Sequence, residues 1–228
     1  MQDVVAVPAN EKLVESIERF LTTMDKNLPG AADQYISMVD QLTENLIHLF
    51  LIEPADMVNL GGSKRRVVDF ASATAGKASH LLTRQIYRKA SNAELAPVAA
   101  NVRELYWPAD EHNDHLPRVS FPISNDYAAD FRQAVEVCAE CRGTTEVPMI
   151  SRVMDELSDG IIEHFFVRNS RTVNMGFVTR KALDTSVETT RKAVRAVNHK
   201  VIGDLNDTGL KHFMGMHSNL VARKPAST

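Results

Sequence analysis

The sequence predicts an all-α protein, built as an internally duplicated helical bundle with about four helices in each repeat and a pseudo-twofold arrangement. Three observations lead to this prediction. Apolar residues recur at intervals of three and four along most of the chain, which is the period of an amphipathic helix. Strand-like runs are confined to residues 4–7 and 118–123, and both are too short to build a sheet. The order of the predicted elements in the second half repeats the order in the first half.

The first half is predicted to contain four helices, at residues 11–27, 32–52, 63–90 and 93–105. The first helix ends at Pro29 and Gly30, because proline lacks a backbone donor and glycine opens the left-handed conformation. Pro54 ends the second helix, and Ser63 is a suitable N-cap for the third. The middle of the third helix has small side chains, which allow a close approach by another helix: Ala71, Ala75 and Ala78.

Residues 106–124 form the one long segment without helical periodicity. The segment holds three prolines and the polar run 110–115, so it is predicted to be a linker loop. Helices resume afterwards at residues 126–142, 147–168, 177–202 and 205–222. The expected organisation is therefore a first helical repeat at 1–105, the linker at 106–124 and a second helical repeat at 125–228.

A shift of 115 residues aligns the two halves of the sequence. Twelve of the 48 pairs from 39/154 to 86/201 are identical, and many of the others are conservative. The identities include Asp40 with Asp155, and the Asn-x-Gly turns that begin at Asn59 and Asn174. Two unrelated amphipathic helices can share an apolar spacing, but they would not share this turn in the same register. The alignment therefore predicts an internal duplication.

Composition excludes several classes of protein. The chain has 228 residues, 44% of them hydrophobic, and a net charge of -3, which suits a globular core. Ten glycines and two cysteines exclude a collagen-like repeat and a disulfide scaffold. No apolar run approaches the roughly 18 residues that a membrane helix needs, and the N-terminus lacks the positive region of a secretory signal. We therefore expect a cytoplasmic protein without a membrane partner.

Acidic pairs on the second helix of each repeat are the candidate metal ligands. Asp40 and Glu44 lie one turn apart, as do Asp155 and Asp159 at the equivalent positions. Carboxylates at i and i+4 project from one helix face, which is how bundle proteins present oxygen ligands to metals. The di-iron Glu-x-x-His motif does not occur. A solvated acidic face, or pairing with a basic helix, explains the same residues, so no cofactor is expected and a divalent metal is the alternative.

Two predicted helices are basic. Residues 63–90 hold seven Lys or Arg and one Asp, and residues 179–202 hold six Lys or Arg and two acids. A pair of such helices related by a pseudo-twofold axis can follow the phosphates of a nucleic-acid duplex. The other interpretation is that the basic third helices pack beside the acidic second helices. No nucleic-acid recognition motif accompanies them.

No complete catalytic set is visible in the sequence. Cys138 and Cys141 form a C-x-x-C motif within a predicted helix, without the second pair that a zinc site requires. Nucleophile elbows, phosphate loops and dinucleotide fingerprints do not occur. We expect a non-enzymatic regulatory or scaffold protein that acts through its helix surfaces on a protein partner and forms a homo-oligomer. The alternatives are a carboxylate metal-binding bundle, acting as regulator, hydrolase or redox enzyme, and a nucleic-acid-binding bundle.

Overall fold

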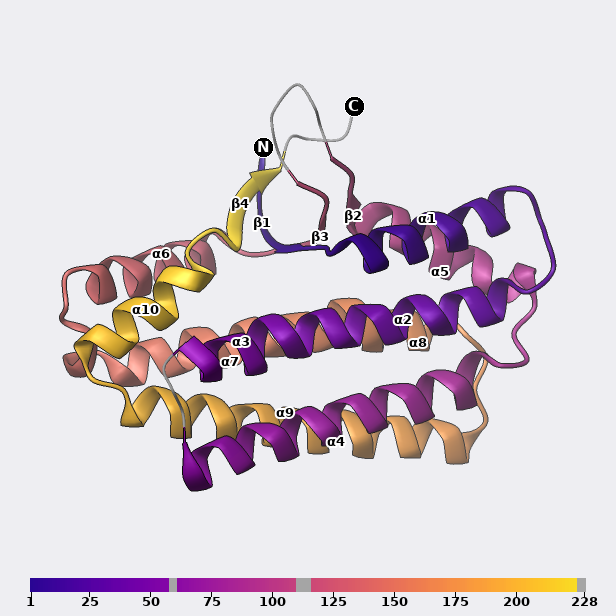
Figure 1. The fold of residues 1–228 in the computed structure, drawn as a ribbon. Coiled ribbons are helices and arrows are strands. Elements are labelled where there is room, and N and C mark those ends of the chain that lie inside the picture. Colours follow the sequence, from indigo (N-terminus) through magenta and orange to yellow (C-terminus); the bar gives the residue numbers. More distant parts are fainter. Residues whose placement is uncertain (58–60, 110–115, 225–228) are drawn as a thin grey trace.

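The computed structural model describes residues 1–57, 61–109 and 116–224, and most of them are helical (Figure 1). The Asn59 turn and the polar run 110–115 lie outside the described residues. The first half contains β1 (Gln2–Pro8), α1 (Glu11–Asp25), α2 (Ala31–Ile47), the π-helix η1 (His48–Ile52), α3 (Glu53–Met57), α4 (Gly62–Tyr87), α5 (Asn92–Leu105) and β2 (Tyr106–Trp107). The second half contains β3 (Arg118–Pro122), α6 (Asn125–Ala139), the 3-10 helix η2 (Gly143–Thr145), α7 (Val147–Ile162), the π-helix η3 (Glu163–Val167), α8 (Arg168–Arg171), α9 (Phe177–Asp204), α10 (Asp207–His217) and β4 (Val221–Lys224).

Polar side chains cap several helix starts, but the prediction that Ser63 caps the third helix is wrong, because α4 begins at Gly62 and its N-cap is Gly61. The side chain of Asn10 accepts a hydrogen bond from the backbone of α1, and Asn206 does the same for α10. Ser91 and Glu94 form a reciprocal capping box at the start of α5. Each predicted helix has a counterpart in the structure, with ends that differ by a few residues. The expectation of a mainly helical protein is therefore confirmed.

Four short strands form an antiparallel sheet in the order β2-β3-β1-β4, so the prediction that no sheet forms is wrong. The two strand-like runs pair with each other, from Val4 opposite Pro122 to Pro8 opposite Arg118. The C-terminal strand β4 adds to the other edge of β1, and β2 adds to β3. The central strand β1 obtains its hydrogen bonds from β3 and β4, both distant in sequence, so a short run is sufficient. Both β2 and β3 belong to the segment that was predicted to be a linker loop.

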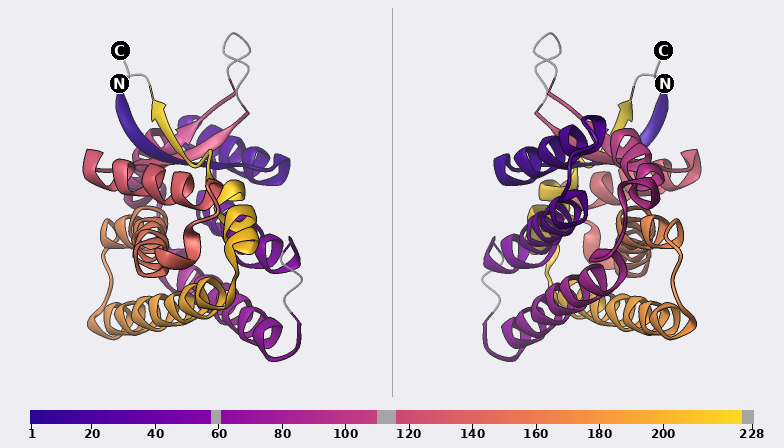
Figure 2. Two further views of the ribbon diagram at one scale, coloured as in Figure 1. Left: turned by 90° about the vertical axis from the view of Figure 1, so that its left-hand side faces the viewer. Right: turned by 90° about the vertical axis from the view of Figure 1, so that its right-hand side faces the viewer.

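The helices lie in layers below this sheet (Figures 1 and 2). The helices α1, α5, α6 and α10 are nearest the sheet, α2 and α7 lie in the middle, and α4 and α9 form the face farthest from it. The helix α4 packs against α2 and α9, and α7 packs against α9. One hydrophobic core includes buried residues from both halves of the chain. None of the described helices combines the length and the apolar character needed to cross a membrane.

Element boundaries in the two halves recur at a separation of 115 residues. The π-helices begin at His48 and Glu163, and the long helices α4 and α9 begin at Gly62 and Phe177. Strand, helix, π-helix and long helix therefore follow in the same order on both sides of residues 110–115.

Candidate functional site

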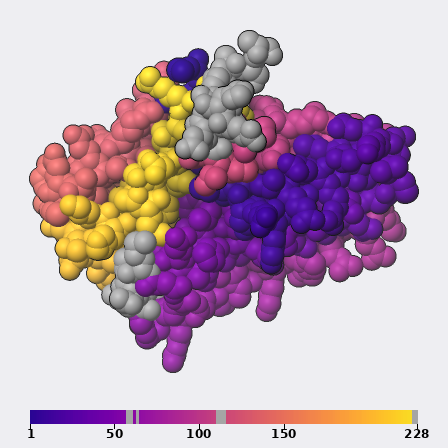
Figure 3. All heavy atoms as spheres, turned by 45° about the horizontal axis from the view of Figure 1, so that its top comes forward, coloured from indigo at the N-terminus to yellow at the C-terminus, as the bar shows by residue number. Residues whose placement is uncertain are grey.

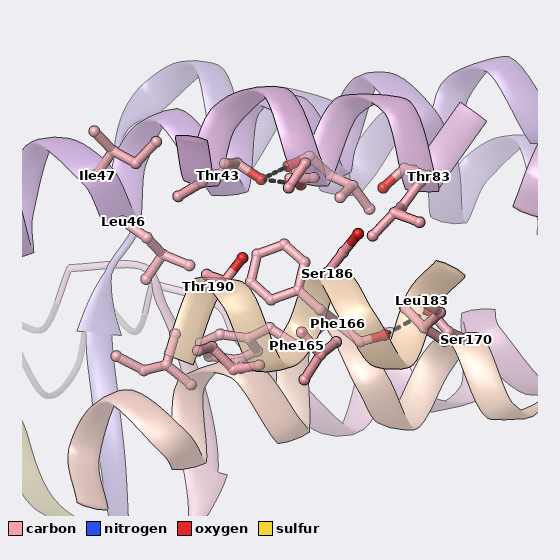
Figure 4. Close-up of a pocket in the computed structure, with 18 of the residues that line it drawn as sticks. Thr43, Leu46, Ile47, Thr83, Phe165, Phe166, Ser170, Leu183, Ser186 and Thr190 are labelled. Atoms are coloured by element: carbon pink, nitrogen blue, oxygen red, sulfur yellow. Dashed lines mark hydrogen bonds between the residues drawn. The ribbon is translucent and has the colours of Figure 1, made fainter. Parts of the chain in front are cut away.

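A cavity of about 140 Å³ lies between the four central helices α2, α4, α7 and α9. Figure 4 shows that its side chains come from both halves of the chain and point toward one another across the space. Leu46 and Thr43 on α2 face Leu183 and Thr190 on α9, while Phe166 extends from η3 into the region between them. The cavity thus lies where the two halves meet.

The lining of the cavity is mostly apolar, and its polar groups are hydroxyls. None of the described residues that line it is Asp, Glu, His, Lys, Arg or Cys. Some hydroxyls are engaged within the protein, since Thr43 Oγ1 donates to the carbonyl oxygen of Val39 at 2.8 Å and lies 2.7 Å from Ser79 Oγ. The lining therefore suits an uncharged, mainly apolar molecule that carries few polar groups.

Three hydroxyl side chains of the lining are free to bind a ligand. Thr83, Ser186 and Thr190 make no hydrogen bond to any part of the chain that the structure describes, and Figure 4 shows them at the edge of the open space. The hydroxyls of Thr185 and Thr189 on the outer side of α9 instead donate to the carbonyl four residues earlier. A hydrogen bond of this kind is common for Ser and Thr within a helix. Thr83, Ser186 and Thr190 do not form it, so their hydroxyls are available as donors and acceptors.

Both π-helices contribute to the cavity wall. Phe50 and Leu51 come from η1, and Phe165 and Phe166 come from η3. A π-helix turns more widely than an α-helix, and single turns of this kind are found frequently at functional sites. Here the wide turn carries two adjacent bulky side chains of each half to the cavity wall.

Two tyrosines form one end of the cavity wall. Tyr35 and Tyr87 are almost fully buried, and their ring centroids lie 4.6 Å apart. Burial raises the pKa of Tyr87 to about 12 and raises the pKa of Tyr35 well above its ordinary value. Neither phenol ionises near neutral pH, so neither can act there as a general base.

The acidic residues proposed as metal ligands lie away from this lining and contact neighbouring helices. Asp155 accepts hydrogen bonds from Asn198 at 3.0 Å and lies 2.8 Å from the His199 ring. Asp159 forms ion pairs with Arg191 and Arg195 on α9.

The acidic pair of the first half, Asp40 and Glu44, makes fewer contacts with neighbouring helices. Asp40 lies 3.1 Å from His80 Nδ1, whereas Glu44 is exposed and has no ion pair with any described residue. Among the described residues, no group of three or more His, Cys, Asp or Glu side chains is close enough to hold a metal ion. The metal assignment of Asp40, Glu44, Asp155 and Asp159 stays a prediction.

The two cysteines also lie outside the cavity, at the end of α6. Cys138 is buried and Cys141 is exposed, and both are free thiols. Burial raises the pKa of the Cys138 thiol to about 11, which keeps it in the less reactive protonated form at neutral pH.

Sequence reasoning missed the cavity because it interpreted small side chains as a close helix contact. Ala71 is buried, but Ala75 and Ala78 are only half-buried and line the open space. One signal was present: with the 115-residue shift, Ala75 aligns with Thr190 and Thr43 with Ser158, so both repeats carry small or hydroxyl residues at these positions.

No protein-family model matches the chain, no curated protein matches it, and no solved structure matches it.

Proposed function

We propose that this chain is a non-enzymatic helical regulatory protein that binds a small, uncharged and mainly apolar molecule between α2, α4, α7 and α9. The observation that supports this most directly is the lining itself: apolar walls from both halves, with the unpaired hydroxyls of Thr83, Ser186 and Thr190. Apolar walls supply affinity through burial, and a few polar groups fix the orientation of the ligand.

Binding is favoured over catalysis at this site by the kinds of residue present. General acid–base or nucleophilic chemistry needs a group that exchanges protons near neutral pH close to the reacting atoms. Among the lining residues that the structure describes, no carboxylate, imidazole or amine lies beside the hydroxyls to activate them. The two tyrosines have pKa values raised by burial.

The proposal includes an internal duplication whose two copies meet at the cavity with pseudo-twofold symmetry. Support comes from pairs of lining residues that are separated by 115 positions, one from each half of the chain. These pairs are Thr43 and Ser158, Leu46 and Ile161, Ile47 and Ile162, Phe50 and Phe165, Leu51 and Phe166, and Ala75 and Thr190. A duplicated chain places like residues around a shared centre, which is how one site can be built from two copies.

The position of the site supports the proposed regulatory role. A ligand that contacts all four central helices favours the arrangement of the two halves in which those contacts are made. The effect is read out at the outer faces of α4 and α9, because each of these helices has one face in the cavity and another toward solvent.

Toluene is a suitable probe, because an apolar cavity of about 150 Å³ in another protein is known to hold benzene. We expect toluene to raise the melting temperature of the wild-type protein, since a ligand that binds only the folded state stabilises it. Ala75→Leu places three further carbon atoms in the cavity and should abolish this rise.

Ala73→Leu is the matched control, because Ala73 is exposed on the outer side of α4 and adds the same atoms to solvent. The rise in melting temperature should persist in this variant. An equal toluene effect in wild type and in Ala75→Leu would show that the probe binds elsewhere and would refute the assignment of the cavity.

A further inference from the structure

The outward face of α4 carries cations with large apolar side chains between them. At 100° per residue, Arg66, Phe70, Lys77, Leu81, Arg84 and Arg88 form one stripe, opposite the stripe that faces the core. All six are exposed, with Phe70 at 70% and Leu81 at 66%. In Figure 3, side chains of the purple segment that includes α4 project beyond the lower edge of the molecule. This set of six residues is called the α4 stripe.

The cations of the α4 stripe are not neutralised by the protein. Arg66, Lys77, Arg84 and Arg88 form no ion pair within the described parts of the chain, and the stripe contains no acid. Four positive charges are therefore available to an external partner.

The corresponding helix in the second half differs in this respect. On α9, Arg191 and Arg195 pair with acids of α7, and Lys192 pairs with Glu188 on α9 itself. The position equivalent to Arg191 is Gly76, and the acid equivalent to Asp159, Glu44, is unpaired in the described structure. These three cations of α9 are thus neutralised within the protein, whereas the four cations of the α4 stripe face outward.

The start of α9 extends the apolar part of this surface. Phe177 is 81% exposed and Val178 is 76% exposed. They lie beside the last turns of α4, because Gln85 Nε2 on α4 is 3.5 Å from Thr179 Oγ1 on α9. Phe177 and Val178 are adjacent, and contiguous exposed apolar surface is a mark of interaction sites.

We propose that the α4 stripe, together with Phe177 and Val178, docks on the surface of a lipid bilayer that contains anionic headgroups. The cations are attracted to the headgroups, while the protruding Phe, Leu and Val side chains enter the boundary between headgroups and acyl chains. This docking departs from the expectation that the protein has no membrane partner, but it is peripheral and needs no membrane-spanning helix. It does not depend on occupancy of the cavity.

Charge and shape favour the bilayer over a second copy of the chain and over nucleic acid. A second copy that used the same surface would bring two unneutralised sets of cations together, and like charges repel. A nucleic-acid backbone would satisfy the cations but would leave Phe70, Leu81, Phe177 and Val178 with little apolar surface to bury against. A bilayer surface accommodates scattered apolar side chains between cations without a preformed groove.

The test is sedimentation of the full chain with vesicles, one set of phosphatidylcholine alone and one of phosphatidylcholine and phosphatidylglycerol in equal parts. We expect binding to the anionic vesicles only, weakened by added salt. Lys77→Gln with Arg84→Gln should lower the partition coefficient on the order of tenfold or more, since each surface cation adds about 1 kcal/mol. Phe70→Ser with Leu81→Ser should also weaken binding to the anionic vesicles. Because this variant keeps every charge, its loss of binding adds to the loss that salt causes.

Matched controls lie on the opposite side of the molecule. Lys12→Gln with Lys26→Gln removes the same charge from exposed, unpaired lysines of the described α1 region, and Leu28→Ser removes an exposed apolar side chain. Both controls should bind as wild type does, and unchanged thermal melts of every variant establish that each is folded.

Three results would overturn the proposal. One is the absence of binding to anionic vesicles by the folded wild-type protein. Another is an equal loss of vesicle binding in the α4 variants and the α1 controls, which would mean that binding depends only on the net charge of the protein. A third is that the wild-type protein does not bind vesicles but forms a dimer or a complex with duplex DNA, and that the α4 variants abolish this association. The α4 stripe would then be the binding surface for that partner.

Discussion

Replacing Ala75 by Leu distinguishes the cavity from the close helix contact that the sequence suggests. A tight contact between α4 and another helix would be overpacked by the larger side chain, at a cost of about 1–3 kcal/mol. In the structure Ala75 is half-buried and lines a cavity of about 140 Å³, so the new side chain has space to occupy. The two interpretations therefore predict opposite signs for the change in stability.

The size of the gain follows from the atoms added. Leu carries three more carbons than Ala, and burial of each contributes about 0.8 kcal/mol, or about 2.4 kcal/mol in all. Ordering the leucine side chain costs about 0.5–1 kcal/mol in rotamer entropy. The net gain is about 1.5 kcal/mol, which corresponds to a rise in melting temperature of about 3–6 °C for a chain of this size.

The assay is chemical and thermal unfolding of Ala75→Leu and of Ala71→Leu beside wild type. Ala71 lies one turn earlier on α4, is 2% exposed and does not line the cavity, so its replacement should destabilise the protein. If Ala75→Leu also lowers the free energy of unfolding by 1 kcal/mol or more, as overpacking costs, then the cavity is closed in solution and the reasoning fails.

Three further predictions concern other parts of the fold. Gly160→Ala should cost about 1–3 kcal/mol, because the new Cβ would lie 2.8 Å from the Phe121 ring, whereas Gly215→Ala meets no atom within 4 Å and should be neutral or stabilising in urea titrations. Burial lowers the pKa of His217 below its ordinary value, so the unfolded state binds more protons and the free energy of unfolding should fall as the pH drops below about 6.5. Denaturation at pH 7 and pH 5 should show a smaller difference for His217→Leu than for wild type; an unchanged difference would assign the pH dependence to other groups. Millimolar Mn²⁺ or Mg²⁺ should leave the melting temperature unchanged, and Asp155→Asn should destabilise the protein by about 0.5–1 kcal/mol through its contacts with Asn198 and His199. A rise with the logarithm of metal concentration that Asp155→Asn removes would instead assign the acidic pairs to a metal site.

Helix positions could be predicted because they depend on local patterns. The periodicity of α1 and the signals at Pro29 and Gly30 act within a few residues, and the structure has one helix ending before these residues and the next beginning after them. The sheet could not be predicted in the same way. Residues 4–7 acquire their hydrogen-bond partners from β3 and β4, more than 100 residues away, and a single strand carries no sign of those partners.

The cavity escaped sequence reasoning for a related physical reason. An alanine such as Ala75 is compatible with a helix in tight contact and with a helix that borders an empty space. Which of the two occurs depends on how α9 crosses α4 and on where the π-helices direct Phe50 and Phe166. The acidic pairs were ambiguous for the same reason. The sequence around Asp159 does not show whether its carboxylate binds a metal ion or pairs with Arg195, as it does in the structure.

A crystal of the protein pressurised with xenon tests the central claim most directly, because xenon binds in apolar cavities of this size. We expect a xenon atom between α2, α4, α7 and α9, bordered by Thr43, Phe166 and Ser186, and no xenon there in crystals of Ala75→Leu. A wild-type crystal in which the four helices have closed, with these side chains in contact and no xenon between them, would contradict the account.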